Sequence, residues 1–401
     1  MSQPKSALII VCDRLGAGFV GPYGNTWLET PCWNRIACEG LLVENHFADS
    51  GDLAQIYRSY WTGQPAWRPD EALVPSLPAV ARAAGLKAVL ITDEPLLINH
   101  PLTADFDEVI ALPPGETITR EMLEQTAAAQ VLDEAYDWLQ RAEHPFLLWV
   151  HAQALAGPWD APYELRADLA DETDPPPPAI VHPPEVHFQE ETDPDLLLGY
   201  QQAYGGQVRA LDACLAPLWT LREDIPALKD ALWLLTSPRG YPLGEHGRVG
   251  NCEQALFGEL LHTPLVLSLP GGVSELTRTT TFSQPFDLYA AICEGAEWTP
   301  TVNSHLIAYA REIDVPPRMW AAANGPRERG LRTLAWYLRE KELDGEIHRQ
   351  LYAKPDDRWE ANEVATRCVE IGDLMSATLR DLLARKDLVA DIPAALANGW
   401  R

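Results

Sequence analysis

The stretch Ala7-Leu8-Ile9-Ile10-Val11-Cys12-Asp13-Arg14 decides the fold. Its run of apolar residues predicts a strand that is buried on both faces, and the acid that follows marks the carboxyl end of that strand. A second apolar run at 231–236 is followed by Ser237-Pro238-Arg239-Gly240. Open α/β sheets bind their ligands at the carboxyl ends of the strands, so we expect these two segments to flank the functional site.

Further apolar runs along the chain alternate with helical patterns. The predicted strands are 87–93, 145–151 and 263–269, and the longest predicted helices are 119–142 and 196–222. This alternation predicts an α/β fold with a mostly parallel central sheet that is covered by helices on both faces. At the start of a shorter helix, Thr30 followed by Pro31 is a favourable N-terminal cap.

The chain changes character after about residue 300. Residues 331–339 alternate between apolar and polar side chains, which predicts one half-exposed antiparallel strand, with 349–353 as its hairpin partner and a helix over 363–386. We therefore predict two domains, an α/β domain over 1–300 and a small C-terminal domain of antiparallel sheet plus helix over 301–401. The segment 157–195, rich in proline and acids, is expected to form a long surface loop inside the first domain.

Composition narrows the possible partners. The chain has 401 residues, of which 46% are hydrophobic, so it can bury a large core. Asp and Glu total 58 against 31 Lys and Arg, which gives a net charge of −27. This charge argues against nucleic acid and anionic membranes as partners, because both require a basic face.

Seven cysteines without a CxxC pair indicate buried thiols. The sequence shows neither a secretory leader pattern nor an apolar run of the ~18 residues that a membrane helix needs, so the expected location is cytoplasmic.

Several motifs together resemble the sulfatase family within the alkaline phosphatase superfamily. The two strand ends and Leu243-Gly244-Glu245-His246-Gly247 resemble the two main signatures of that family, and Tyr23-Gly24, Thr30-Pro31 and Glu39-Gly40 match the stretch between them. The resemblance covers most of the chain. It implies the sulfatase fold and, in an active member, hydrolysis of sulfate esters by a formylglycine nucleophile beside a calcium ion.

The positions that would carry this chemistry depart from the family pattern. Two adjacent metal-binding aspartates of the family correspond here to Asp13 and Arg14, and the later Asp-Asn or Asp-His pair corresponds to Pro238 and Arg239. Counting back from Thr62-Gly63 places the family nucleophile at Leu53.

The cationic positions of the family pattern have changed as well. The family arginine corresponds to Tyr57, with Arg58 displaced by one position and able to replace it in part, and a family lysine corresponds to Asn251.

These changes predict that no metal or other cofactor is bound. Calcium is coordinated by six to eight oxygens, whereas Asp13 is the only retained family ligand and supplies at most two. Asp13 is either a relic ligand or the partner of Arg14 or Arg239 in a salt bridge. The two arginines either bind a sulfate, phosphate or carboxylate in place of the metal, or only neutralise nearby acids.

Three functions are consistent with the sequence. The first is an inactive sulfatase-like protein that binds a small oxyanion, a sulfated or phosphorylated ligand, or a protein partner. Its candidate binding residues are Asp13, Arg14, Tyr57, Arg58, Arg239, His246 and Asn251. The second is an active sulfate or phosphate ester hydrolase that holds calcium in a rearranged site, with ligands such as Asp13, Glu245, His246 and Asp49 or Asp52. The third is a structural subunit of a larger assembly.

Overall fold

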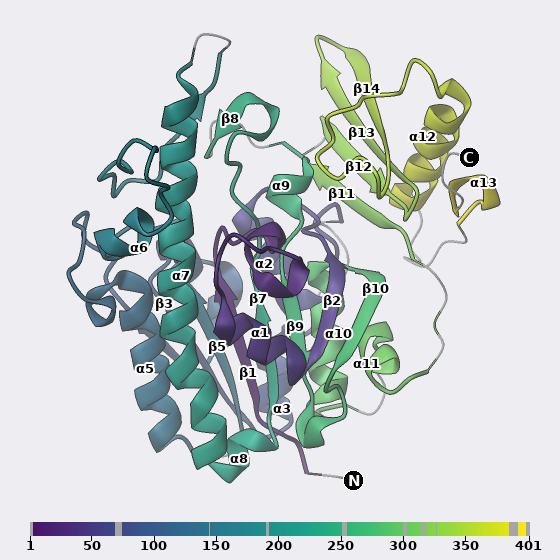
Figure 1. Ribbon diagram of the computed structural model, residues 1–401. Coiled ribbons are helices and arrows are strands. Elements are labelled where there is room, and N and C mark those ends of the chain that lie inside the picture. The colour runs from purple at the N-terminus through teal and green to yellow at the C-terminus, as the bar shows by residue number, and fades with distance from the viewer. Residues whose placement is uncertain are drawn as a thin grey trace.

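A computed structural model of the protein describes residues 3–68, 74–143, 145–189, 192–250, 255–299, 303–313, 315, 318–325, 327–384 and 392–397. The described residues form a large sheet in the body of the molecule, a four-stranded sheet at the C-terminal end (Figure 1) and a short two-stranded sheet.

The large sheet has eight strands in the order β10-β2-β9-β7-β1-β5-β3-β4. In chain order they are β1 (Ala7–Cys12), β2 (Leu41–His46), β3 (Lys87–Thr92), β4 (Glu108–Ala111), β5 (Phe146–Ala152), β7 (Leu232–Thr236), β9 (Leu265–Ser268) and β10 (Thr277–Ser283). Only β9 runs antiparallel to its neighbours. The prediction of a mostly parallel α/β sheet is confirmed.

The helices lie on both faces of this sheet. They are α1 (Pro31–Cys38), α2 (Leu53–Thr62), α3 (Leu77–Ala83), α4 (Pro95–Ile98), α5 (Ala127–Arg141), α6 (Tyr163–Ala167), α7 (Pro194–Asp224), α8 (Pro226–Lys229), α9 (Gly258–Leu261), α10 (Pro285–Gly295) and α11 (His305–Ala310). Short 3-10 turns occur at Ala17–Phe19, Gly21–Tyr23, Pro101–Asp105, Leu123–Gln125, Glu245–Gly247 and Pro270–Gly272.

Alternation along β1 shows how the two cores form. Ile9 and Val11 point into the core shared with α2, α3 and α10, while Leu8 and Ile10 point into the core shared with α1, α5 and α7. Because successive side chains of a strand face opposite sides, a strand covered on both faces must be apolar throughout. This explains why the uninterrupted apolar run in the sequence predicted a central strand.

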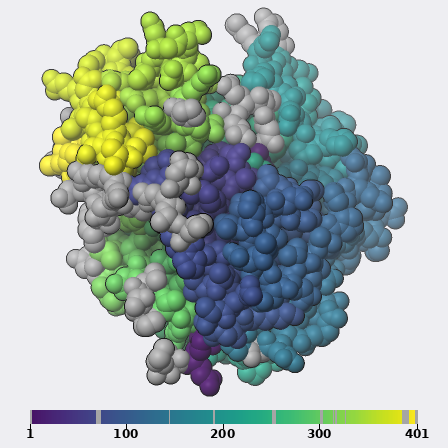
Figure 2. Space-filling model, turned by 180° about the vertical axis from the view of Figure 1, so that it is seen from behind, coloured from purple at the N-terminus to yellow at the C-terminus, as the bar shows by residue number. Residues whose placement is uncertain are grey.

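The C-terminal sheet contains β11 (Trp320–Asn324), β12 (Glu328–Arg332), β13 (Trp336–Leu343) and β14 (Glu346–Ala353), all antiparallel, with α12 (Val369–Ala384) and α13 (Ala394–Ala397) beside it. Figure 2 shows these yellow-green residues at one corner of the molecule, next to purple residues of the N-terminal half. Trp320 belongs to the core of the large sheet and donates from Nε1 to the Ala48 carbonyl at 3.1 Å. The domain boundary at 300 stays a prediction.

Four local predictions are wrong in detail. The single strand predicted over 331–339 is divided between β12 and β13, because the Thr333 hydroxyl accepts hydrogen bonds from the backbone of Ala335 and Trp336 and turns the chain. The helix predicted from 119 begins at Ala127, where Thr126 provides the cap. The helix predicted over 363–386 begins only at Val369, and residues 385–386 lie outside the described ranges.

The fourth concerns the cap of α1. The Thr30 hydroxyl accepts from the Gly21 amide instead of capping the helix. The carboxylate of Asp212 on α7 binds the first amides of α1, those of Cys32 and Trp33.

The proline-rich segment 157–195 is more ordered than a bare loop. It contains α6 and the short strand β6 (Val186–His187), which pairs with β8 (Arg248–Val249). Buried Arg166 holds the segment together by donating to the carbonyls of Trp159, Pro178 and Ile180. These bonds satisfy backbone oxygens that no strand or helix partner reaches.

Candidate functional site

The carboxyl ends of β1 and β7 are joined by a buried ion pair. Arg239 donates from Nε to Asp13 Oδ1 at 3.1 Å and from Nη2 to Oδ2 at 2.9 Å. Burial raises the pKa of Asp13, but the charge and hydrogen bonds of Arg239 outweigh it, so the carboxyl pKa lies below its usual value. Asp13 is fully buried, and only 12% of the Arg239 side chain is exposed. The salt bridge predicted from the sequence is therefore present.

Arg14 brings a second buried guanidinium to this place. Its backbone adopts a left-handed conformation with φ 66°, and its Nη1 donates to the Gly240 carbonyl at 3.2 Å. Its Nε is buried and has no hydrogen-bond partner among the described residues. Burial, together with the nearby charge of Arg239, lowers the pKa of Arg14 to about 9. Arg14, Arg239 and Asp13 together carry two positive charges and one negative charge, and Glu94 and Asp52 lie near enough to raise the pKa of Arg239 further.

Helix α2 begins at the predicted nucleophile position. Leu53 is its first residue and is packed in the core of the sheet. Asp52 caps the helix by accepting from the Gln55 amide at 2.9 Å. The hydroxyls of α2 are also engaged, because Ser59 donates to Asp49 and Thr62 donates to the Arg58 carbonyl. No nucleophile is positioned by α2 at this place.

Tyr57 and Arg58, the two candidates for the family arginine, have different surroundings. The hydroxyl of Tyr57 is hydrogen-bonded to Nδ1 of His151, at the end of β5, at 2.5 Å. Both side chains are fully buried. Arg58 points to the loop after α2 and donates to the carbonyls of Pro65 and Arg68. The structure therefore places Tyr57 in a packed contact and gives Arg58 a role in holding that loop. The position of His151 at a strand end was the only sign of the Tyr57–His151 bond in the sequence.

The residues at the strand ends do not fit calcium. Both oxygens of Asp13 accept from Arg239, and the neighbouring side chain is a second cation. Calcium requires six to eight oxygen donors, most of them from several carboxylates. Among the described residues, no group of three or more His, Cys, Asp or Glu side chains is arranged to hold a metal ion.

The other ligands of the active-hydrolase alternative are held in separate contacts. Asp49 accepts from the Ser59 hydroxyl and the Ala66 amide, and burial raises its pKa to about 7. Glu245 accepts from the Leu243 amide at 2.7 Å. His246 is hydrogen-bonded to Glu259 at 2.9 Å and to the Glu360 carbonyl at 3.3 Å. Asn251 lies outside the described residues.

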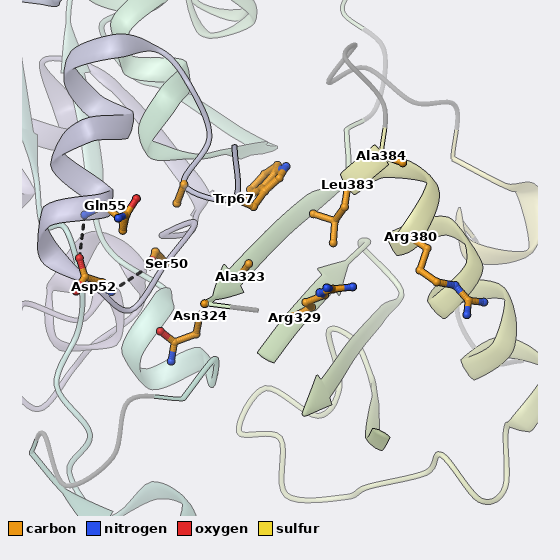
Figure 3. Close-up of a pocket in the computed structure, with 12 residues that line it drawn as sticks. Ser50, Asp52, Gln55, Trp67, Ala323, Asn324, Arg329, Arg380, Leu383 and Ala384 are labelled. Atoms are coloured by element: carbon orange, nitrogen blue, oxygen red, sulfur yellow. Dashed lines mark hydrogen bonds between the residues drawn. The ribbon is translucent and has the colours of Figure 1, made fainter. Parts of the chain in front are cut away.

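A cavity of about 750 Å³ opens beside the first turn of α2 (Figure 3). It lies between the body of the protein and the C-terminal sheet, with Ser50, Asp52 and Trp67 on one side and Arg329 and Arg380 on the other (Figure 3). Neither arginine has an ion-pair partner among the described residues. No sequence motif points to these two arginines, because they lie on exposed strand and helix positions far from any signature.

The eight-stranded, mostly parallel sheet flanked by helices, with a small antiparallel sheet at the C-terminal end, is the fold of the alkaline-phosphatase-like class of proteins. The sulfatase family model matches residues 5–297, and the chain belongs to the sulfatase family.

Two human enzymes are related at low identity. N-acetylgalactosamine-6-sulfatase is 22% identical over 359 residues, covering 74% of this chain, and iduronate 2-sulfatase is 21% identical over 364 residues, covering 72%. The chain spans 63% and 64% of the length of these relatives. Among solved structures, the phosphonate monoester hydrolase of Agrobacterium radiobacter superimposes with a TM-score of 0.77 at 16% identity and covers 95% of each chain. At this identity the likeness concerns the fold alone.

The helices of the described residues are too short or too polar to span a membrane.

Proposed function

We propose that this sulfatase-family protein does not hydrolyse sulfate or phosphate esters and serves to bind an oxyanion. The observation that supports this most is the two-point ion pair between Arg239 and Asp13, at the strand ends where an active member is expected to hold its cation. A guanidinium there would compete with a metal for the same carboxylate oxygens.

The surroundings of the pair support the loss of turnover. Leu53 cannot act as a nucleophile, and the nearby thiol of Cys12 is not activated, because burial raises its pKa to about 12. His151 is also a poor proton carrier at neutral pH, since burial lowers its pKa to about 4. A nucleophile needs an adjacent base to become reactive. Leu53, Cys12 and His151 therefore provide neither a reactive nucleophile nor an adjacent base.

The charges of the site support oxyanion binding. Arg14 and Arg239 together exceed the single charge of Asp13, and Arg14 Nε lacks a hydrogen-bond acceptor among the described residues. A buried guanidinium is stabilised by an acceptor with matching geometry, and sulfate, phosphate and carboxylate provide one. Binding of a protein partner and a cytoplasmic location were also predicted from the sequence, and both remain proposals.

Metal content and turnover of the purified protein test the first half of the proposal. We expect no stoichiometric divalent metal, and no hydrolysis of an aryl sulfate or an aryl phosphate with or without added calcium or manganese. One tightly held divalent ion together with metal-dependent turnover would overturn the proposal and favour the rearranged-hydrolase alternative.

Calorimetric titration with sodium sulfate tests the second half. The wild type should release or absorb heat with saturation, whereas Arg239→Ala and Arg14→Met should bind at least tenfold more weakly. Arg278→Ala is the matched control, because Arg278 is an exposed arginine paired with Glu44. Absence of heat with the wild type, or equal heats for all four proteins, would sink the oxyanion assignment.

A further inference from the structure

A second cavity, of about 410 Å³, opens where the N-terminal half of the chain meets the loop that follows β14. Trp27 and Phe47 line it from the first of these segments, and Trp359 lines it from the second. The described residues that line it do not include Asp13 or Arg239, so the ion pair at the strand ends is not part of it. Its volume lies in the range of roughly 300–1,000 Å³ that is typical of sites for small organic ligands.

Both of the exposed tryptophans in the described part of the chain line this cavity. Trp27 is 42% exposed and Trp359 is 60% exposed, whereas every other tryptophan that the structure describes is buried or half-buried. An indole carries a large apolar area, so exposing one to water gives up the free energy that its burial would supply. Two exposed indoles at one cavity therefore indicate a surface kept for a ligand.

The indole of Trp27 is carried by a fixed turn. The side-chain oxygen of Asn25 accepts from the amide of Trp27 at 3.0 Å and from that of Leu28 at 2.7 Å. The Nδ2 of Asn25 donates to the Gly18 carbonyl at 2.7 Å. An Asn side chain that binds the backbone two residues further on is typical of a tight turn. This turn fixes the backbone of Trp27 before any ligand arrives.

The loop that carries Trp359 is held by a buried ion pair. Lys354 donates from Nζ to Glu360 Oε1 at 3.1 Å, and 1% of each side chain is exposed. The same Nζ donates to the Asp357 carbonyl at 2.6 Å. Trp359 lies between these two attachment points in the sequence. Because a site that is already ordered loses little entropy on binding, both indoles are suited to a ligand.

Each indole has a ring face that no other aromatic side chain covers. Neither Trp27 nor Trp359 makes a ring contact with another aromatic residue among those described. The guanidinium carbon of Arg358 lies 5.0 Å from the ring centroid of Trp359 and occupies one face, which leaves the opposite face. Aromatic rings stack with an offset on such faces. A planar aromatic ring is therefore a ligand that both tryptophans can bind.

The cavity is also lined by a guanidinium that lacks an acceptor. Arg332 lies over Phe47, with its guanidinium carbon 4.5 Å from the ring centroid. Its Nε is buried and has no hydrogen-bond partner in the part of the chain that the structure describes. The Glu360 carboxylate lies 3.8 Å from Nη1, beyond hydrogen-bond distance, and it already accepts from Lys354 and the Gly258 amide. An acceptor atom on a ligand would satisfy this buried donor.

Donors and acceptors are balanced in this lining. Its described residues include two carboxylates, Glu245 and Glu259, and two guanidiniums, Arg332 and Arg358. His262, which also lines the cavity, is neutral because burial lowers its pKa to about 3. Glu245 accepts from a backbone amide at 2.7 Å, and a carboxylate can accept about four such bonds. The lining therefore favours a ligand without net charge whose edge both donates and accepts.

We propose that this cavity binds a neutral, planar heteroaromatic compound of the purine type, such as a free base or a nucleoside. Trp27 and Trp359 would provide the stacking faces, and Arg332 and Glu245 would bind the edge of the ring. Guanine shows the match, because its O6 and N7 accept from a guanidinium and its N2 amino group donates to a carboxylate. Phosphate groups would meet no surplus of positive charge in the described lining, so a nucleotide fits less well. The inference does not depend on the oxyanion assignment at the strand ends.

Calorimetry with guanosine tests the proposal on the whole protein. We expect saturable binding that Trp27→Ala and Trp359→Ala each weaken at least tenfold, since each removes one stacking face. Trp359→Phe should recover most of the affinity that Trp359→Ala loses, because a phenyl ring still stacks. Leu276→Ala is the control, because Leu276 is an exposed apolar side chain outside the cavity. All four substitutions are at exposed positions, so the variants should keep the fold.

Three outcomes would overturn the proposal. They are no saturable binding of guanosine, equal weakening by Leu276→Ala, and binding of cellobiose that depends on Trp359 and is tighter than that of guanosine. The last result would assign the cavity to a neutral saccharide instead. Arg239→Ala should retain guanosine binding, and sodium sulfate should not compete with guanosine. A failure of the oxyanion proposal and a failure of this one therefore give different results.

Discussion

Arg239 and Asp13, 226 positions apart in the chain, meet through two hydrogen bonds at the ends of adjacent parallel strands. The bond directions match, because a guanidinium presents parallel donors to the two oxygens of a carboxylate. Nearly all of the pair is removed from water. Neither residue can therefore change alone without leaving a buried charge.

The first prediction concerns the stability of this pair. Arg239→Ala should lower the free energy of unfolding by about 3–5 kcal/mol, because it leaves the Asp13 carboxylate buried and unpaired. The double variant Asp13→Leu/Arg239→Leu should lie close to the wild type, since apolar replacements remove both charges. Urea unfolding measures both. An Arg239→Ala protein as stable as the wild type would contradict a stabilising role for the buried pair. The control is Arg278→Ala, which breaks an exposed ion pair and should lower the free energy of unfolding by about 1 kcal/mol or less.

The second prediction concerns the contact between Tyr57 and His151. Tyr57→Phe removes the hydroxyl and leaves a buried imidazole nitrogen without that partner, which should cost about 1–3 kcal/mol of unfolding free energy. Tyr60→Phe is the matched control on the same helix, because the Tyr60 hydroxyl donates to the Ser237 carbonyl over a long distance of 3.4 Å. Equal losses for the two variants would mean that the Tyr57–His151 bond contributes no more than an ordinary contact.

The third prediction is a pH dependence that arises at Asp49. Burial raises the pKa of Asp49 to about 7 in the folded protein, while an unfolded aspartate has a pKa of about 3.9. Between these values the folded state binds more protons than the unfolded state, so this group contributes stability at low pH that is lost as the pH rises toward 7.

The variant Asp49→Asn has no such titration. Its unfolding free energy minus that of the wild type should therefore increase by roughly 2–4 kcal/mol between pH 4.5 and pH 8. Urea unfolding of both proteins across this range gives the difference at each pH, and the contributions of all other groups cancel. Parallel stability curves would show that Asp49 is ionised in the folded protein throughout.

The fourth prediction concerns calcium. A ligand that binds only the folded state stabilises it by RT ln(1 + L/Kd), where L is the free ligand concentration, so the unfolding temperature rises as the ligand concentration increases above Kd. Because the donors at Asp13 do not fit calcium, the unfolding temperature should be the same in millimolar calcium and in EDTA. A rise that grows with calcium concentration would reveal a site that the strand ends do not account for.

The sequence alone determined the class of fold. Uninterrupted apolar runs such as 7–12 and 231–236 can be buried only in the middle of a layered sheet, and that requirement is local to each strand. The identity of the changed positions was also visible in the sequence, since Leu53, Tyr57 and Arg239 interrupt motifs whose order along the chain survives.

Only the tertiary structure decided which partner each of these residues has. The cap of α1 shows the reason, because a local rule favoured Thr30, while the carboxylate that binds the helix comes from Asp212, about 180 positions away. The same holds for Arg239, whose partner could have been any nearby acid. Spacing in the sequence limits neighbours along a strand or helix, whereas contacts between distant segments follow from how the sheets pack.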